Sequence, residues 1–306
     1  MTKRLLFTLL IVLNLGFASS LKDEKPLVSV SIPPQAYFVR QIAADTLKIN
    51  VLIPSGTDEH NFDFKPSVMK ELENSDIYFG IGLELEKVLI NRFTNLAKNL
   101  HFVDTGEGLR KQDFHHENSH SHHHEDTHEK KHAHHHDDDL HEKKHTHHDD
   151  PHIWLDPLLV EKQAELIASK LIATYPQNKA LYEANLAKFK AELDALNAQI
   201  ASLLAHKKGK KFIVYHPSWG YFAARYHLVQ IPVEFEGKEP KPKDLQKLIR
   251  TAKQEKIRTI FIQKGFPQAM AKNLAKELNA NVVEINHLSE DWHNELLKSA
   301  KNLGLE

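Results

Sequence analysis

Short apolar runs of strand length alternate with segments of helical periodicity through the first third of the chain. The runs that predict strands are residues 28–32, 49–53 and 76–81. The segments that predict helices are residues 34–44, 66–73 and 84–96, and two of them have a proline in the first turn, where proline is favoured. This alternation predicts a parallel sheet covered by helices.

A long amphipathic segment lies in the middle of the chain. Helical periodicity runs from about residue 157 to 173 and again from Pro176 to about residue 206. In the second segment one apolar stripe recurs at spacings of three to five residues: Leu181, Leu186, Phe189, Leu193, Leu196, Ile200 and Leu203. Roughly thirty helical residues make a rod of about 45 Å, which is long enough to connect two lobes.

A second β–α series follows Gly209. Its predicted strands are residues 211–215, 228–233, 258–262 and 281–285. Its predicted helices are residues 219–225, 242–255, 267–278 and 291–303. We therefore expect an α/β protein of two lobes with parallel-rich sheets, joined by one long helix. Ligands in such sheets bind at the carboxyl ends of the strands, here in the cleft between the lobes.

Residues 113–150 interrupt this pattern and hold 15 of the 23 histidines, mixed with Asp, Glu and Lys and with almost no apolar residue. Such a segment cannot bury a core, so we expect a disordered, His-rich insertion. The predicted division of the chain is an N-terminal lobe of residues 26–112 and 151–175, a linking helix of residues 176–206 and a C-terminal lobe of residues 207–306.

Composition restricts the chemistry. The 306 residues are 41% hydrophobic and carry a formal charge of −1, so no basic excess indicates nucleic acid. Cysteine is absent, which excludes disulfides, thiolate metal sites and a lipid-modified N-terminal cysteine. A zinc site in this chain must use nitrogen and oxygen ligands.

The first twenty residues resemble an export signal. Lys3 and Arg4 precede an apolar run over residues 5–13, and small residues follow at Gly16 and Ala18. We expect a cleaved signal peptide at residues 1–20 and a periplasmic protein without a lipid anchor. An uncleaved anchor is the alternative, although the run is short for a membrane span.

Three histidines outside the insertion follow predicted strands or open an ordered segment. His60 lies in the loop after the strand that ends at Ile53, His152 comes where order resumes at Pro151, and His216 follows the strand that ends at Tyr215. Neutral imidazole suits zinc, and three imidazoles leave room for a fourth ligand. We take these three histidines, from both halves of the chain, as candidate ligands.

Four ordered motifs carry a resemblance to a known family. They are Glu59-His60 with Lys65-Pro66-Ser67, the segment from Pro151 to Pro157, the segment from Tyr215 to Phe222, and the segment from Glu236 to Lys243. Together they resemble the zinc-binding components of bacterial ABC importers, over about residues 27–303. The resemblance implies two lobes bridged by a long helix, metal in the interlobe cleft, and His60, His152 and His216 as the ligands.

The fourth ligand stays open at this point. The resemblance makes Glu59 a candidate, whereas the family's C-terminal Asp-Pro is Asn286-His287 in this chain. An amide oxygen is a poorer zinc donor than a carboxylate, so Glu59, a water, Asn286 or His287 are the possibilities. Manganese-carrying relatives have a carboxylate where this chain has His216, which favours zinc here; copper and nickel would also suit three imidazoles.

Asp156 has two interpretations, as a helix N-cap before Pro157 or as a partner of a metal-binding histidine, and we favour the cap. Trp154 and Trp219 are expected to pack. The histidine clusters of the insertion are expected to collect metal weakly for the cleft; a solvated linker without this role is the alternative.

From these residues we expect Zn²⁺ capture in the periplasm and delivery to an inner-membrane ABC permease with a cytoplasmic ATPase, by a monomer that is not an enzyme. Protons compete with zinc for imidazole, so affinity should fall as the pH drops through about 6 to 7. A periplasmic zinc buffer or adhesion protein without a transport partner is one alternative. A zinc hydrolase is another, although the chain contains no His-Glu-x-x-His motif.

Overall fold

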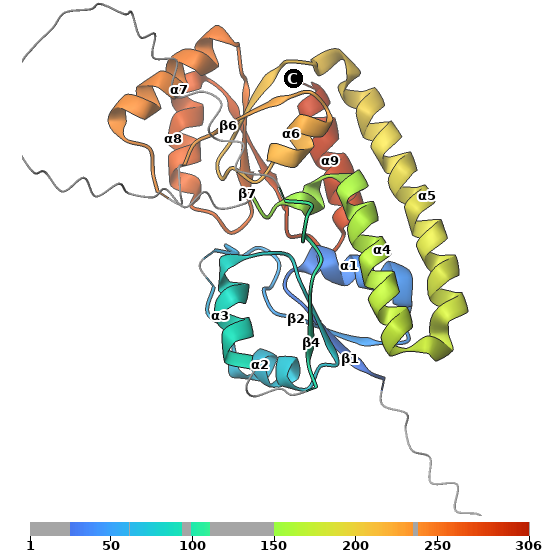
Figure 1. Cartoon of the computed structure of the whole chain (residues 1–306). Helices are drawn as coiled ribbons and strands as arrows, with labels where there is room; N and C mark the ends of the chain where they lie inside the picture. Colours follow the sequence, from blue (N-terminus) through green and yellow to red (C-terminus); the bar gives the residue numbers. More distant parts are fainter. Residues whose placement is uncertain (1–24, 61, 94–98, 111–149, 235–237, 306) are drawn as a thin grey trace, which may run out of the picture.

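The computed structural model describes residues 25–60, 62–93, 99–110, 150–234 and 238–305. The predicted signal peptide and residues 113–149 of the predicted insertion lie outside these ranges. The described residues form two lobes, each built on a four-stranded parallel sheet (Figure 1). The predicted two-lobed α/β fold is thereby confirmed.

The N-terminal lobe has the strand order β2-β1-β3-β4. Its strands are β1 (Leu27–Val30), β2 (Lys48–Val51), β3 (Ile77–Gly80) and β4 (His101–Asp104). Its helices are α1 (Pro33–Ala43), α2 (Pro66–Glu73) and α3 (Glu84–Phe93). Strand β4 was not among the predicted elements, since four residues with a histidine at the start carry little strand signal.

The C-terminal lobe repeats this order as β6-β5-β7-β8. Its strands are β5 (Lys211–Val214), β6 (Val229–Pro232), β7 (Thr259–Gln263) and β8 (Asn281–Ile285). Its helices are α6 (Gly220–Arg225), α7 (Pro242–Gln254), α8 (Gln268–Leu278) and α9 (Trp292–Leu305). Strand β7 is buried along its whole length, as expected of a central parallel strand covered on both faces.

One long helix, α5 (Lys179–Leu204), connects the lobes. It follows helix α4 (Pro157–Thr174) and runs along one side of both lobes (Figure 1). The predicted linking helix is confirmed, with a 3₁₀ turn at each end. Helix α5 packs against α1 and α4 near the N-terminal sheet and against α9 in the C-terminal lobe. Its 26 residues span about 39 Å.

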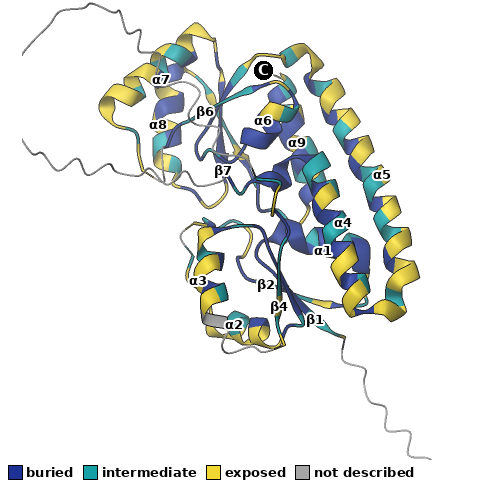
Figure 2. Cartoon of the chain, in the orientation of Figure 1, coloured by how far each residue is buried: buried dark blue, intermediate teal, exposed yellow. Residues whose placement is uncertain are grey.

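Most of the predicted apolar stripe of α5 belongs to a core that both lobes share, whereas Leu181 at its start is 41% exposed. Phe189, Leu193, Leu196 and Ile200 are buried in one hydrophobic cluster that includes residues of both sheets. The opposite face of α5 is exposed along the side of the molecule (Figure 2). The ring of Phe189 lies 6.1 Å from that of Phe38, and the ring of Phe38 lies 5.2 Å from that of Trp292 of α9. Aromatic packing therefore joins the lobes through α1, α5 and α9.

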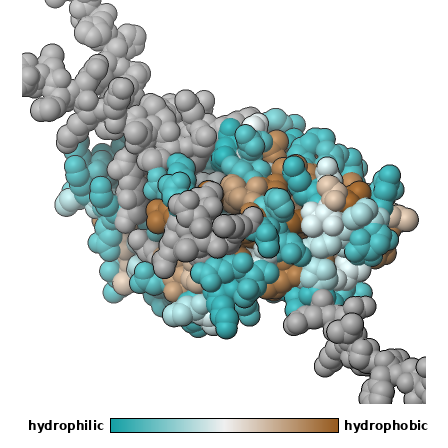
Figure 3. Space-filling model, turned by 60° about the horizontal axis from the view of Figure 1, so that its bottom comes forward, coloured by the Kyte–Doolittle hydropathy of each residue, from teal (hydrophilic) through white to brown (hydrophobic). Residues whose placement is uncertain are grey.

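The described surface is mainly polar. In the view of Figure 3, hydrophilic residues cover most of the described surface, and apolar residues appear in scattered places between them. Among the described helices, none combines the length and the apolar character that crossing a bilayer requires.

Candidate metal centre

Glu59 and His60 lie on the loop that follows β2. Gly56, with a φ of 76°, makes the turn that a Pro-Ser-Gly-Thr-Asp sequence favours. The Asp58 carboxylate accepts a 2.9 Å hydrogen bond from the backbone N–H of His60, which fixes the end of the loop. Glu59 is fully buried, whereas His60 remains exposed to solvent. The loop therefore turns the Glu59 carboxylate into the protein.

His152 lies in the turn before α4, between the two lobes. Asp150 accepts two hydrogen bonds through Oδ1, one from the His152 backbone N–H at 2.9 Å and one from its Nδ1 at 2.6 Å. The Tyr221 hydroxyl of the C-terminal lobe donates to the Asp150 carbonyl at 2.9 Å. Because Nδ1 is held by a carboxylate, Nε2 of His152 is the nitrogen left to face Glu59.

His216 follows β5, at the carboxyl end of a strand next to the centre of its sheet. Its Nδ1 donates to Glu234 Oε1 at 2.5 Å, and its backbone N–H donates to Gln263 Oε1 at 3.1 Å. The imidazole stacks on Phe266 with ring centroids 4.8 Å apart. His216 thus repeats the pattern of His152, with a carboxylate on one ring nitrogen and the other nitrogen left for a ligand.

The four side chains predicted as metal ligands come together. Potential ligand atoms of Glu59, His60, His152 and His216 all lie within 4.8 Å of one another. His60 Nε2 is 3.2 Å from His216 Nε2, and His152 Nε2 is 3.3 Å from Glu59 Oε1. Tetrahedral zinc with bonds near 2.0 Å separates its ligand atoms by about 3.3 Å. Two of the distances between ligand atoms therefore already fit such a tetrahedron. The two ligand atoms that lie farthest apart, at up to 4.8 Å, have to approach each other by about 1.5 Å at most.

Glu59 is held from the opposite lobe as well. His287, two residues beyond β8, donates from Nε2 to Glu59 Oε1 at 2.8 Å. Neither side chain is exposed to solvent. Asn286 lies outside the cluster and donates instead to Ser55 Oγ at 3.0 Å. Of the C-terminal pair considered as ligands, His287 therefore contacts a cluster residue and Asn286 contacts the loop.

Charges within the cluster oppose the effect of burial. Burial by itself raises the pKa of Glu59, but the attraction of His287 and hydrogen bonds from His152 and His287 outweigh it and hold that pKa well below its usual value. Burial lowers the pKa of His152, yet Asp150 and Glu59 together raise it to about 9. His60 as a whole residue is exposed, but its ring is desolvated by the neighbouring groups. This desolvation, with repulsion from His216 and His152, outweighs the attraction of Glu59 and lowers the pKa of His60 to about 4.

These directions say which group carries a proton before metal arrives. With its pKa raised to about 9, His152 is protonated at neutral pH, and its Nε2 faces the ionised Glu59 carboxylate at 3.3 Å. A metal ion that takes Nε2 of His152 must displace this proton. Nε2 of His152 is therefore a nitrogen at which protons and a metal compete.

Two carboxylates that orient the histidines were not identified from the sequence. Asp150 falls inside the range predicted as the insertion, but it is buried and hydrogen-bonded to His152. Glu234 follows β6 by two residues, as His216 follows β5, and that shared position was the available signal. Asp156 is the N-cap of α4, with Oδ1 accepting from the Leu158 N–H at 2.9 Å, as favoured from the sequence.

Trp154 packs in the core, as predicted, and also hydrogen-bonds to the loop that carries His287. It is fully buried, and its indole N–H donates to the His287 carbonyl at 2.8 Å. Its own carbonyl accepts from the indole N–H of Trp292 at 2.8 Å. The turn that carries His152 is thus tied to the loop that carries His287.

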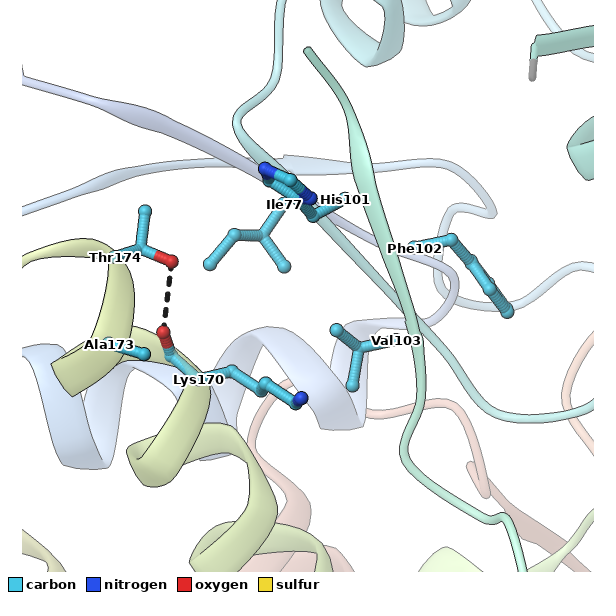
Figure 4. A pocket seen from close by; sticks show the side chains of 7 residues that line it. All are labelled: Ile77, His101, Phe102, Val103, Lys170, Ala173 and Thr174. Atoms are coloured by element: carbon cyan, nitrogen blue, oxygen red, sulfur yellow. Dashed lines mark hydrogen bonds between the residues drawn. The ribbon is translucent and has the colours of Figure 1, made fainter. Parts of the chain in front are cut away.

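A second depression lies away from these residues, between β4 and the end of α4 (Figure 4). Its volume is about 380 Å³, and His101 and Lys170 are its titratable lining residues. The Thr174 hydroxyl donates a 3.0 Å hydrogen bond to the Lys170 carbonyl. With an imidazole, an ammonium group and no carboxylate, this depression does not offer a cation the ligands that the cluster offers.

A family model matches most of the chain. The model described as "Zinc-uptake complex component A periplasmic" covers residues 28–299. The chain is 24% identical to a putative metal-binding protein of Chlamydia trachomatis, over 97% of this chain and 98% of that protein. It is 27% identical to the high-affinity zinc uptake system protein ZnuA of Bacillus subtilis, over 89% of this chain and 81% of that protein.

Solved structures show the same arrangement. A crystal structure of ZnuA superposes with a TM-score of 0.78 and 34% identity, over 92% of this chain and 98% of that one. A zinc-bound ZnuA mutant that lacks its residues 138–173 superposes with a TM-score of 0.77, also at 34% identity, over 91% of this chain and 96% of that one.

Proposed function

This chain belongs to the family of periplasmic zinc-uptake complex component A proteins, and we propose that His60, His152, His216 and Glu59 are the four ligands with which it captures Zn²⁺ for an ABC-type importer. The convergence of these four donors within 4.8 Å carries the proposal. Two of them come from the loop after β2, one from the turn before α4 and one from the loop after β5. The ion would therefore bind both lobes at once.

The donor types support zinc. Three imidazoles and one carboxylate are a common zinc ligand set, and no thiolate is available in this chain. Carboxylates on Nδ1 of His152 and His216 are the second partners that zinc-bound histidines usually have. These partners fix the ring orientation and the tautomer, so less entropy is lost when the ion binds.

Burial supports transport over catalysis. Glu59 is 0% exposed, His152 4% and His216 6%, so three of the four donors are screened from water. A hydrolytic zinc site keeps an open position for water and substrate. The family is one of substrate-binding transport proteins, in keeping with this difference.

The exposed ligand suggests the route of the ion. His60 is the solvent-exposed member of the cluster and lies on a surface loop. Zinc would contact His60 first and then displace the proton on His152. Release to the permease would reverse these steps when the loop is drawn away. Our proposal includes export through the signal segment at residues 1–20, a monomeric protein, and a His-rich segment that collects zinc for the cleft without forming the tight site.

Isothermal titration with a variant that lacks residues 113–149 tests the proposal. The deletion must stop before Asp150, because this residue holds His152. We expect one tight zinc site to remain. His60→Ala or His216→Ala in this background should weaken zinc binding by more than about 100-fold, beyond what loss of an outer partner causes.

The matched control is His101→Ala, which removes an exposed histidine of the same lobe outside the cluster. It should bind zinc like the parent. Loss of tight binding on deletion of residues 113–149 alone would refute the proposed site, and so would tight binding that survives both cluster substitutions.

A further inference from the structure

His287 contacts the cluster without being one of its four donors. Its imidazole is fully buried, and Nε2 donates to Glu59 Oε1 at 2.8 Å. The other ring nitrogen, Nδ1, has no hydrogen-bond partner among the described residues. An unpartnered buried polar atom is costly, and the hydrogen bond from Nε2 to Glu59 offsets part of that cost.

The surroundings of His287 hold it in place. Its backbone carbonyl accepts a 2.8 Å hydrogen bond from the Trp154 indole. Its ring lies nearly parallel to that of Trp154, with centroids 6.4 Å apart, and 6.1 Å from that of Phe266. Large, rigid side chains on both sides restrict the imidazole to the orientation in which Nε2 points at Glu59.

Glu59 has two anchors before zinc binds and one afterwards. Its Oε1 atom faces both His152 and His287, while Oε2 is buried without a hydrogen-bond partner among the described residues. Zinc bound to Nε2 of His152 takes this nitrogen away from Glu59. The carboxylate then keeps only His287 to hold it while its remaining lone pairs face the ion.

We infer that His287 is the positioning residue of the fourth ligand: its Nε2–H holds the Glu59 carboxylate from the opposite lobe in the place where the carboxylate meets zinc. This inference rests on the proposed zinc site. It also gives the site a second connection between the lobes, because Glu59 lies on the loop after β2 and His287 lies on the loop after β8. Apposition of these loops is then part of zinc affinity.

A matched pair of substitutions isolates the role of Nε2. The amide nitrogen of Gln lies as far along the side chain as Nε2 of His, whereas that of Asn lies at the position of Nδ1. His287→Gln therefore keeps a donor for Glu59, and His287→Asn loses it, while both variants place a neutral amide in the same cavity. Each is made in the full chain and in the Glu59→Gln variant, with His293→Gln as a control in the same lobe.

Zinc affinity is measured by competition with a chromophoric chelator, and the visible absorption of the Co²⁺ form reports the ligand set. We expect His287→Asn to weaken zinc binding about 10- to 100-fold, as loss of an outer partner does, and to change the Co²⁺ spectrum. His287→Gln should stay within about threefold of the parent and keep its spectrum. With Glu59→Gln present, the Asn and Gln variants should bind alike.

The inference is overturned if His287→Asn and His287→Gln bind zinc equally, or if they differ as much without the Glu59 carboxylate as with it. Thermal unfolding in chelator verifies that both amide variants fold. If Glu59→Gln binds zinc like the parent while His60→Ala does not, this inference fails and the histidine site stands. If His60→Ala has no effect, the proposed function itself fails.

Discussion

The two sides of the interlobe boundary are built differently. On one side, which we call the fixed side, α1, α4, α5 and α9 share one apolar core that reaches both sheets. On the other, the cleft side, loops after β2, β5, β7 and β8 meet through polar contacts. Asn286 donates to Ser55 at 3.0 Å there, and His287 donates to Glu59 at 2.8 Å.

This difference shows where the protein can move. Separating the lobes at the fixed side would expose aromatic side chains, each of which contributes several kcal/mol to stability. Opening the cleft side breaks a few hydrogen bonds, each of which contributes about 1 kcal/mol. Zinc entry and release are therefore expected to move the loops at the cleft and leave the fixed side intact.

The largest effect should come from a cavity in the fixed side. Phe189→Ala removes a buried ring that packs against Tyr37 and Phe38 at 5.9 and 6.1 Å. We expect the free energy of unfolding to fall by about 3–5 kcal/mol in urea titrations, while the folded protein still binds one tight zinc. Leu181→Ala, on the same helix but 41% exposed, is the control and should lose much less. A loss of less than about 1 kcal/mol for Phe189→Ala would mean that α5 does not join the lobes.

Buried polar groups around Glu86 lie beneath the cleft side, and they should make the free energy of unfolding depend on pH. Glu86 accepts hydrogen bonds from Ser31 Oγ and from the backbone N–H groups of Ile81 and Gly82, just beyond β1 and β3. Burial raises the pKa of Glu86 to about 7, against the effect of these hydrogen bonds. The unfolded chain ionises this group near 4.5, so the folded state holds more protons between these two values.

Stability due to Glu86 is therefore complete below about pH 4.5 and is lost as the pH rises to about 7, by about 3 kcal/mol. Glu86→Gln has no such titration, so the difference in unfolding free energy between parent and variant should drift by that amount over this window. Chelator-treated protein is used in urea titrations at several pH values. A difference that stays constant from pH 4.5 to 7 would contradict the assignment.

A substitution at Gly265 should have the smallest effect on stability and a clear effect on zinc affinity. Gly265 has a φ of 96°, and a Cβ atom there would lie 2.6 Å from the backbone oxygen of Gly56, across the cleft. Gly265→Ala should push away the loop that carries Glu59 and His60. We expect about 1–2 kcal/mol of destabilisation and a zinc affinity at least about tenfold lower.

Gly209→Ala is the control for this substitution. Its φ of 75° imposes a similar strain, but a Cβ atom there meets nothing within 4 Å. It should lose similar stability and keep its zinc affinity in chelator competition. Equal zinc affinities for the two variants would show that the approach of the loops does not matter.

The fold and the histidines could be predicted from the sequence because both follow local patterns. Buried parallel strands are nearly continuous apolar runs, and prolines mark the starts of α1, α2, α4 and α7. His216 comes two residues after a strand, at the edge of the sheet where ligands bind. Among the described strands, β4 lacked such a signal, because His101 and Asp104 leave only two apolar residues between them.

The carboxylates that orient the histidines depend on tertiary contacts and were harder to find. Asp150 resembles its acidic neighbours in the insertion, and only burial against Tyr221 and His152 distinguishes it. His287 lies 228 residues from Glu59 in the chain, so no sequence spacing could indicate their hydrogen bond. That His287 is a hydrogen-bond partner of Glu59, and not one of the four donors, could be seen only once the two lobes were placed together in the structure.

Zinc K-edge X-ray absorption on the full chain loaded with one equivalent of zinc tests the central claim most directly. Our account predicts three imidazole nitrogens and one oxygen at about 2.0 Å, with a spectrum that does not change when residues 113–149 are removed. It also predicts that the spectrum changes when His216 is replaced by Ala. A spectrum that changes on removal of residues 113–149 and is indifferent to His216→Ala would contradict the account, because zinc would then bind the histidines of the insertion.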